Sequence, residues 1–197
     1  SGTDEMKIFE GRVTARMRVP FGRTRPEIAR RMLLDAGVGR DSVVLDLGSG
    51  AGDILLEAAR LGARAIGVEI DPALVAESRR RAAEAGLSGR VRVLMGDFLR
   101  AGLPRADVVT LYLTREANAA VARALEAELP LAKVVAHGFP VPGWRPLEVD
   151  EYGGTRIYIY VPALSSSGIL GRGGGGGAPP PRAPPRRGRG GCLRKKI

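Results

Sequence analysis

Short runs of apolar, often β-branched residues alternate along the chain with longer runs in which apolar residues recur every three or four positions. The first pattern predicts seven β-strands, over residues 42–47, 64–69, 91–95, 107–113, 132–137, 147–152 and 155–161. Several of these runs are apolar almost throughout, as in SVVLDL and AKVVAH, which is typical of strands buried on both faces. Strands that alternate with helices predict an α/β domain with a mostly parallel sheet, helices on both faces, and a final antiparallel strand that closes the sheet.

The helical pattern covers four segments, residues 24–36, 54–60, 72–85 and 116–129. Thr24 and Glu27 have the spacing of a capping box at the start of the first helix. Asp71 is placed as the N-cap of the third helix. Gly62 and Gly86 are expected to end the second and third helices in the left-handed conformation.

From residue 165 onward the periodic pattern stops, and Gly, Pro and Arg dominate. Such a segment buries too little apolar surface to offset the conformational entropy of ordering it, so residues 165–197 are predicted to form a disordered tail. We expect one domain over residues 18–164, preceded by an N-terminal extension over residues 1–17.

The formal net charge is +10, but residues 164–197 hold eight basic residues and no acidic one, so the rest of the chain is nearly neutral. Two interpretations of the basic tail stay open. It binds nucleic acid weakly through phosphate contacts, or it is a solvated extension without such a role. Arg makes up 27 of the 31 basic residues and Gln is absent, which suits a thermophile, although a GC-rich genome also favours Arg.

A single cysteine, Cys192, and a single histidine, His137, exclude a disulfide framework and the usual His/Cys zinc sites, so no metal site is expected. A hydrolase triad would depend on His137 alone. No apolar run approaches the roughly 18 residues that cross a bilayer, and the start of the sequence lacks an apolar signal segment. We therefore expect a soluble, cytoplasmic protein.

The first predicted strand runs into the sequence DLGSGAG, residues 46–52, and then directly into a helix. Glycines allow the backbone to approach a ligand closely, and a helix N-terminus offers free N–H groups. The dinucleotide fingerprint G-x-G-x-x-G would need a glycine where the chain has Asp53. The observed spacing resembles motif I of the class I S-adenosylmethionine-dependent methyltransferases, which implies that Asp46, Gly48, Ser49 and Gly50 bind the cofactor. The alternative is a tight turn before a helix.

The next two predicted strands also end in acidic residues. Glu69 ends the second strand, where a carboxylate can accept the hydroxyls of a ribose bound across the switch point of an open sheet, and Ile70 follows it. After the third strand, Asp97 offers an acceptor for an exocyclic amine and Phe98 an apolar surface for adenine. The alternative for Asp97 is a helix N-cap. Three strand ends thus suit the amino acid, ribose and adenine parts of S-adenosylmethionine.

Five segments occur together and in a characteristic order: VPFGRT, VVLDLGSGAG, GARAIGVEIDPALV, DVVTLYL and KVVAHGFPVPGW. Together they resemble the archaeal seven-strand protein-lysine methyltransferases and their mitochondrial relatives, which modify lysines of the ATP synthase c-subunit and of the adenine nucleotide translocase. The resemblance covers residues 18–161. It implies a Rossmann-like class I methyltransferase fold and methyl transfer from S-adenosylmethionine to protein lysines.

Two motifs depart from that family. A Pro-Thr element before the first helix helps to close over the cofactor there, and Thr24 matches its threonine, whereas Arg23 replaces its proline. The glycine loop of the family usually reads Asp-Gly-Arg where this chain has Ala51, Gly52 and Asp53. These departures bear on individual cofactor or substrate contacts and leave the fold assignment intact.

Lysine methylation requires a neutral amine, because the unperturbed lysine pKa is about 10.4. Tyr112, at the end of the fourth strand, is the candidate catalytic residue that orients the amine through its hydroxyl. His137, Phe139 and Trp144 are expected to wall the substrate channel, partly by cation–π attraction. The alternative for each of these four residues is a structural role in the core or in a turn.

The end of the fourth strand reads LYLT and lacks the Asp/Asn-Pro-Pro-aromatic motif of many amino-group methyltransferases, which disfavours methylation of bases or of glutamine. The size of the chain leaves no room for a separate substrate domain, so we expect a monomer with a broad range of protein substrates. Two alternatives stay open. They are an RNA or small-molecule methyltransferase on the same fold, and a cofactor-binding or nucleic-acid-binding protein without catalysis.

Overall fold

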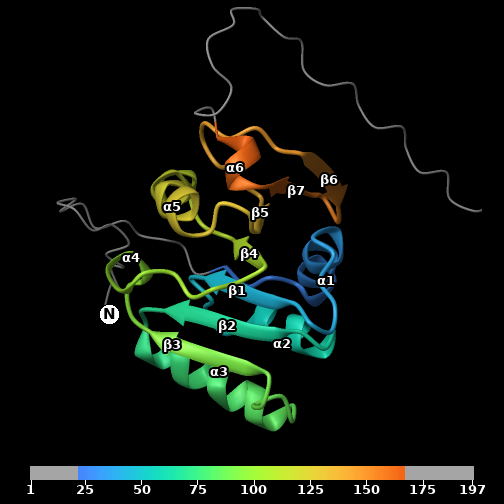
Figure 1. The fold of residues 1–197 in the computed structure, drawn as a ribbon. Helices are drawn as coiled ribbons and strands as arrows, with labels where there is room; N and C mark the ends of the chain where they lie inside the picture. Colours follow the sequence, from blue (N-terminus) through green and yellow to red (C-terminus); the bar gives the residue numbers. More distant parts are fainter. Residues whose placement is uncertain (1–21, 167–197) are drawn as a thin grey trace, which may run out of the picture.

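The computed structural model describes residues 22–166, and these form a three-layer arrangement of helices around one sheet (Figure 1). The strands are β1 (Val43–Leu47), β2 (Arg64–Glu69), β3 (Val91–Met95), β4 (Val108–Leu111), β5 (Lys133–His137), β6 (Glu148–Tyr152) and β7 (Thr155–Tyr160). The helices are α1 (Pro26–Asp35), α2 (Asp53–Arg60), α3 (Pro72–Glu84), α4 (Phe98–Ala101), α5 (Arg115–Glu128) and α6 (Pro162–Ser165). All seven predicted strands and all four predicted helices are present within one or two residues of their expected ends.

The strand order is β3-β2-β1-β4-β5-β7-β6. Strands β1 to β5 pair in parallel, while β7 pairs antiparallel with both β5 and β6, so the sheet is mostly but not entirely parallel. The antiparallel direction of β7 confirms the prediction, but its expected position does not hold, because β7 lies inside the sheet and β6 forms the edge. The chain runs outward in opposite directions from β1 and from β4, so the switch point lies between these two strands.

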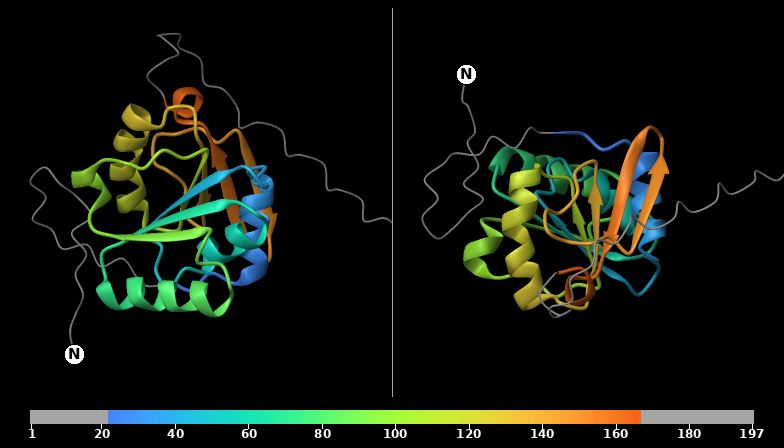
Figure 2. Two further views of the ribbon diagram at one scale, coloured as in Figure 1. Left: turned by 60° about the horizontal axis from the view of Figure 1, so that its bottom comes forward. Right: turned by 90° about the horizontal axis from the view of Figure 1, so that it is seen from above.

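Alternate residues of the central strands face two separate hydrophobic cores, which explains the nearly continuous apolar runs in the sequence. Val44 packs into one core with Met32 of α1 and Leu55 of α2. Its neighbour Leu45 packs into the other with Leu125 of α5. Figure 2 shows α1 and α5 on opposite sides of the sheet. The predicted arrangement of helices on both faces is therefore confirmed.

The predicted capping box at the start of α1 is wrong. The helix begins at Pro26, whose fixed φ is suited to the first helical position, and no side chain caps it. Thr24 consequently lies two residues before the helix, and its own N–H donates to Asp53 Oδ2 at 2.9 Å. By contrast, the predicted cap of α3 is confirmed, since Asp71 Oδ1 accepts a hydrogen bond from the N–H of Ala73 at 2.8 Å.

The fold extends slightly beyond the predicted domain boundary at residue 164. Ser165 ends α6, is buried, and accepts a hydrogen bond on Oγ from the N–H of Val161. Ser166 forms a bridge with Trp144. The predicted N-terminal extension lies outside the described residues. So does the predicted tail, apart from its first two residues, 165 and 166. Between residues 22 and 166, no helix combines the length and the apolar character needed to cross a bilayer.

Candidate functional site

The carboxyl ends of the parallel strands meet at one edge of the sheet, and most of the predicted site residues lie there. The loop between β1 and α2 carries Gly48, Gly50 and Gly52, all with positive φ, at 73°, 55° and 87°. A Cβ at Gly48 would lie 2.9 Å from Cδ2 of Leu113, which is two residues beyond the end of β4. Glycine is therefore required at this position both by the backbone conformation and by the close approach of a neighbouring strand end.

Glu69, at the end of β2, binds the glycine loop directly. Its Oε1 accepts the N–H of Gly50 at 2.8 Å, and its Oε2 accepts the N–H groups of Ile70 and Asp71 at 2.8 and 3.0 Å. The side chain is buried. A carboxylate has about four acceptor positions, so one remains on Oε1. Acceptance of both hydroxyls of a ribose in this arrangement requires the bond from Gly50 to open.

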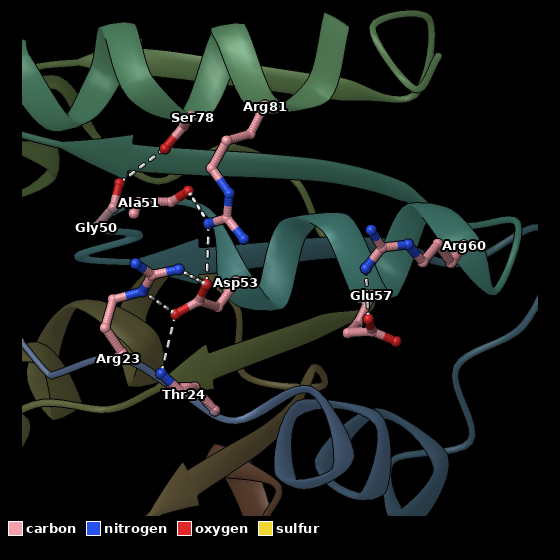
Figure 3. Close-up of polar contacts among 9 residues, drawn as sticks. All are labelled: Arg23, Thr24, Gly50, Ala51, Asp53, Glu57, Arg60, Ser78 and Arg81. Atoms are coloured by element: carbon pink, nitrogen blue, oxygen red, sulfur yellow. Dashed lines mark hydrogen bonds and ion pairs between the residues drawn. The ribbon is translucent and has the colours of Figure 1, made fainter. Parts of the chain in front are cut away.

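Helix α3 supports the outer side of the same loop (Figure 3). The hydroxyl of Ser78 donates to the carbonyl oxygen of Gly50 at 2.8 Å, and Nη1 of Arg81 donates to the carbonyl oxygen of Ala51 at 2.6 Å. A Cβ at Gly52 would lie 3.1 Å from Ser78 Oγ, so the loop and the helix are packed closely. The glycine loop is thus held from two sides, by Glu69 and by α3.

Asp53, the first residue of α2, receives four hydrogen bonds. Arg23 donates to both carboxylate oxygens at 2.9 Å, the N–H of Thr24 donates to Oδ2 at 2.9 Å, and Arg81 donates to Oδ1 at 2.9 Å. Burial raises the pKa of this carboxyl, but the bonds from Arg23, Thr24 and Arg81 outweigh burial, so the pKa of Asp53 lies below its ordinary value. Sequence reasoning noted Asp53 only as a departure from the family motif and missed this role.

Asp46 lies at the deep end of the site, in β1. It is fully enclosed, and the hydroxyl of Thr110 on β4 donates to its Oδ1 at 2.8 Å. Burial raises the pKa of Asp46 to about 7; the bond from Thr110 opposes this shift, and the nearby charges of Glu69 and Asp53 add to it. An acidic group with this pKa changes its charge near neutral pH, and it is suited to respond to a cationic ligand.

Ser49 and Phe98 turn away from the open side of the site. A Cβ at Gly67 would lie 2.5 Å from Ser49 Oγ, so this hydroxyl points at the backbone of β2, and only Gly67 leaves room for it. Phe98 is 6% exposed and packs in the hydrophobic core beneath β3 and β4. Asp97 directly precedes α4, with its Oδ2 3.8 Å from Arg100 Nε, which agrees with its alternative placement at a helix start. Cofactor contacts by these residues stay predictions.

Tyr112 and His137 meet at the ends of β4 and β5. Their ring centroids are 4.3 Å apart, and their planes are tilted by 33°. His137 is buried, and its Nδ1 has no hydrogen-bond partner among the described residues. Burial lowers the pKa of His137, and the positive charge of Arg25 lowers it further. The lowered pKa keeps His137 uncharged at neutral pH, and its ring faces that of Tyr112.

The sequence from residue 46 to residue 148 matches the profile of the ANTKMT methyltransferase domain. The chain belongs to this methyltransferase family. It is 36% identical over 150 residues to a protein-lysine N-methyltransferase from Saccharolobus islandicus, a match that covers 73% of this chain and 93% of that protein. It is also 34% identical over 166 residues to the adenine nucleotide translocase lysine N-methyltransferase of Mus musculus, covering 80% of this chain and 72% of that protein.

Solved structures show the same relationship. The crystal structure of an RNA methyltransferase from Salinibacter ruber, in complex with S-adenosyl-L-homocysteine, superposes with a TM-score of 0.70 at 36% sequence identity. The superposition covers 76% of this chain and 97% of that chain. Together with the family profile, it identifies this methyltransferase as S-adenosylmethionine-dependent, with a Rossmann-like class I fold.

The residues of this methyltransferase fit that cofactor. The glycine loop leaves room for close approach of a ligand, Glu69 retains an acceptor position for a ribose hydroxyl, and the buried Asp46, with a pKa of about 7, is an acid that a cationic ligand would favour in its ionised form. Glu69 also joins Gly50 and Ile70 through hydrogen bonds, so these predicted residues are brought together as expected.

Trp144 of this methyltransferase lies away from the strand ends where Glu69, Tyr112 and His137 are found. Its indole N–H donates to Glu126 Oε1, near the end of α5, at 2.7 Å, and its ring meets Tyr160 edge-on at 5.5 Å. Tyr160 pairs with Val134, near the start of β5. His137 lies three residues further on, at the end of β5. The sequence HGFPVPGW placed Trp144 close to His137 along the chain, but the loop returns to the opposite end of β5.

Phe139 lies two residues after His137, and its side chain is half exposed. The side-chain amide of Asn118, in the first turn of α5, donates to the carbonyl oxygen of Phe139 at 3.1 Å. Asn118 is fully buried, and its Oδ1 has no partner among the described residues. Sequence reasoning did not propose this residue, although Asn118 is the single asparagine of the chain. It holds the loop that carries Phe139.

Proposed function

We propose that this methyltransferase transfers a methyl group from S-adenosylmethionine to the ε-amino group of lysine residues in proteins, with a broad range of substrates. The observation that carries this proposal is the 36% identity to the Saccharolobus islandicus protein-lysine N-methyltransferase across 93% of that protein. The site supports it, because the aromatic rings of Tyr112 and His137 meet where β4 and β5 end. The end of β4 also lacks the motif typical of base methylation.

The donor supplies an activated methyl group on a sulfonium, so the protein has to hold both reactants and present a neutral amine. The amine lone pair forms the new N–C bond, the C–S bond breaks, and its electron pair stays on sulfur. The methylated ammonium then loses a proton to solvent when it is to be methylated again. No strong base is required, which agrees with a site whose only histidine has a lowered pKa.

Within this proposal, Tyr112 is the catalytic residue, because its hydroxyl can accept a hydrogen bond from the amine and fix the direction of its lone pair. His137 packs against Tyr112 and, being uncharged, does not repel a cationic lysine or the sulfonium. Phe139 contributes an apolar wall to the channel. Trp144 is not part of the proposed channel.

The cofactor contacts are proposed as follows. The amino acid end lies over Gly48 and Gly50, the ribose is bound by Glu69, and the adenine lies near the end of β3. Further contacts are proposed for a set of flanking residues, Thr24, Asp46, Ser49, Ile70, Asp97 and Phe98. Asp46 is suited to balance cationic charge, since its pKa of about 7 allows it to ionise when a cation binds.

Finer properties are proposed from composition. Abundant Arg and absent Gln support a thermophilic origin, and we also propose a cytoplasmic location. We further propose that the enzyme acts as a monomer, built from one domain that begins at residue 18 and includes Ser165 and Ser166 beyond its expected end at residue 164, with an N-terminal extension and a basic tail that binds nucleic acid weakly.

An RNA substrate is the second candidate, favoured by one observation, the 36% identity to an RNA methyltransferase from Salinibacter ruber. The two are separated by incubation of the purified enzyme and labelled S-adenosylmethionine with cell extract from which endogenous activity was removed by heat. Protease treatment should remove the label, and mass spectrometry should locate added methyl groups on lysine. Label that survives protease but not ribonuclease would instead assign the enzyme to RNA. Glu69→Ala serves as the control without cofactor binding.

A further inference from the structure

The short segment that precedes α1, residues 22–24, is tied to the start of α2. Arg23 donates two hydrogen bonds of 2.9 Å to the Asp53 carboxylate, one to each oxygen, and the N–H of Thr24 donates a third. Figure 3 shows both residues on the coil that leads into α1, turned toward Asp53. Paired hydrogen bonds between a guanidinium and a carboxylate fix geometry as well as distance. We call Arg23, Thr24, Asp53 and Arg81 the Asp53 network.

The other end of this segment touches the proposed methyl-transfer site. A Cβ at Gly22 would lie 2.8 Å from Cε1 and 3.2 Å from the hydroxyl oxygen of Tyr112, so the backbone at Gly22 lies directly on this ring. The segment therefore runs from Asp53, beside the glycine loop, to Tyr112. Any shift of Arg23 and Thr24 moves the surface against which Tyr112 packs.

Asp53 is well placed to transmit such a constraint. Its side chain is 15% exposed, whereas that of Arg23 is 55% exposed, so the carboxylate is the more enclosed partner of this ion pair. Arg81 of α3 binds both Asp53 and the carbonyl oxygen of Ala51 in the loop. Asp53 thus joins three parts of the molecule, the segment before α1, the glycine loop and α3.

We propose that Asp53 is a positioning residue that fixes residues 22–24 against the glycine loop and thereby sets the position of Tyr112. Its effect on catalysis rests on the proposed role of Tyr112 in lysine methylation. The structural part stands on hydrogen bonds alone.

The first test measures hydrogen exchange of the Thr24 amide by NMR in the enzyme without cofactor. Asp53→Ala removes the acceptor of this amide, and we expect its exchange to speed up by about tenfold or more. Arg23→Ala, which changes a half-exposed side chain, should give a smaller increase in the same direction. Arg60→Ala is the matched control, because Arg60 pairs with Glu57 on the same helix α2 and does not contact residues 22–24. Unchanged Thr24 exchange in Asp53→Ala would overturn the proposal.

The second test is a double-mutant cycle between Asp53 and Tyr112. Asp53→Ala should lower kcat by about tenfold, and the double variant should be no slower than Tyr112→Phe alone, because Asp53→Ala misplaces the hydroxyl that Tyr112→Phe removes. Arg60→Ala should leave kcat unchanged. Fully additive losses in the cycle would overturn the link from Asp53 to Tyr112. If the wild-type enzyme methylates no lysine, the proposed function fails, and Thr24 exchange still decides whether the Asp53 network holds the segment.

Discussion

The ring of His137 packs on the ring of Tyr112, with centroids 4.3 Å apart, although Tyr112 follows β4 and His137 ends β5. The backbone of Gly22 lies against the same ring, since a Cβ there would be 2.8 Å from Tyr112 Cε1. Tyr112→Phe keeps the packing and removes only the hydroxyl. We expect kcat for a lysine peptide to fall by about 10- to 100-fold, the effect of one hydrogen bond to a charged or reacting group, about 1.4–3 kcal/mol.

The same variant should bind S-adenosylhomocysteine like the parent, because the proposed cofactor contacts lie on β1, β2 and β3. Calorimetry with this product and steady-state kinetics with the peptide separate the two effects. Tyr112→Phe with full kcat would assign Tyr112 to packing alone.

His137 should make the protein less stable as the pH falls. Burial and Arg25 lower its pKa in the folded state, so below about pH 6.5 the unfolded chain takes up a proton before the folded protein does. The free energy of unfolding should therefore decrease with falling pH until His137 is protonated in the folded state as well. His137→Asn removes this contribution. Urea unfolding at about pH 7.5, 6.5 and 5.5 should give a smaller acid-side loss for the variant than for the parent, and equal slopes would refute the assignment.

Asp46 should have the opposite pH dependence. Its pKa of about 7 in the folded state exceeds its ordinary value of 3.8, so the folded protein binds the extra proton between these values, and stability decreases as the pH rises through this range. Asp46→Asn keeps an acceptor for the Thr110 hydroxyl and removes the ionisation. Above about pH 8 the variant should be more stable than the parent, by up to about 4 kcal/mol, with little difference near pH 4.

The gain in stability at Asp46 should be accompanied by a loss of function. A cationic donor favours the ionised carboxyl, so S-adenosylmethionine should bind the parent more tightly as the pH rises through 7, and Asp46→Asn should lose this increase. Calorimetry at about pH 6 and pH 8 measures it. The neutral thioether S-adenosylhomocysteine is the matched ligand, and it should show the smaller change. An equal change of affinity with pH for both ligands would show that Asp46 does not respond to the charge of the sulfonium.

Local signals were sufficient to predict most of the elements from the sequence. Apolar periodicity indicated the strands, the spacing of Gly48 and Gly50 indicated the loop, and Asp71 beside a proline indicated the start of α3. Each of these signals involves residues only a few positions apart, so it can be recognised without knowledge of tertiary contacts. The capping box at Thr24 failed because Pro26 fixed the helix start two residues later, and a long-range bond then took the Thr24 amide.

The contacts that organise the site join distant residues, and no local pattern specifies them. Asp53 lies 30 residues from Arg23 and 28 from Arg81, and its bonds to them exist only after α1, α2 and α3 have packed. The ring contact of Tyr112 with His137 likewise requires β4 and β5 to pair in register. Sequence reasoning found the residues at the strand ends because topology alone brings them together, but it could not find the bonds that hold them.

Trp144 should contribute to stability and not to catalysis. Trp144→Phe removes the indole N–H bond to Glu126 and part of the edge contact with Tyr160. We expect a loss of about 1–3 kcal/mol in the free energy of unfolding, while kcat and KM for a lysine peptide stay unchanged below the unfolding range. A raised KM in a fully folded variant would show that Trp144 does line the substrate channel.

Glu69 should be needed for both the loop and the cofactor, and Glu69→Gln tests the two together. Each oxygen of Glu69 accepts a backbone N–H, from Gly50 on one side and from Ile70 and Asp71 on the other. A glutamine amide must turn its NH2 group toward one of these sides, where a donor then faces a donor. We expect the free energy of unfolding to fall by about 1–3 kcal/mol, since a buried hydrogen-bond donor loses its acceptor.

The same Glu69→Gln variant should bind S-adenosylhomocysteine at least tenfold more weakly in calorimetry, because the ribose loses a charged acceptor. Glu84→Gln is the matched control, since it removes an exposed ion pair with Arg80 of the kind that contributes less than about 1 kcal/mol. A Glu69→Gln variant with the unfolding midpoint and product affinity of the parent would show that the acid at the end of β2 supports neither the glycine loop nor a ribose. The identification of this strand end as the cofactor site would then be lost, whatever substrate the enzyme methylates.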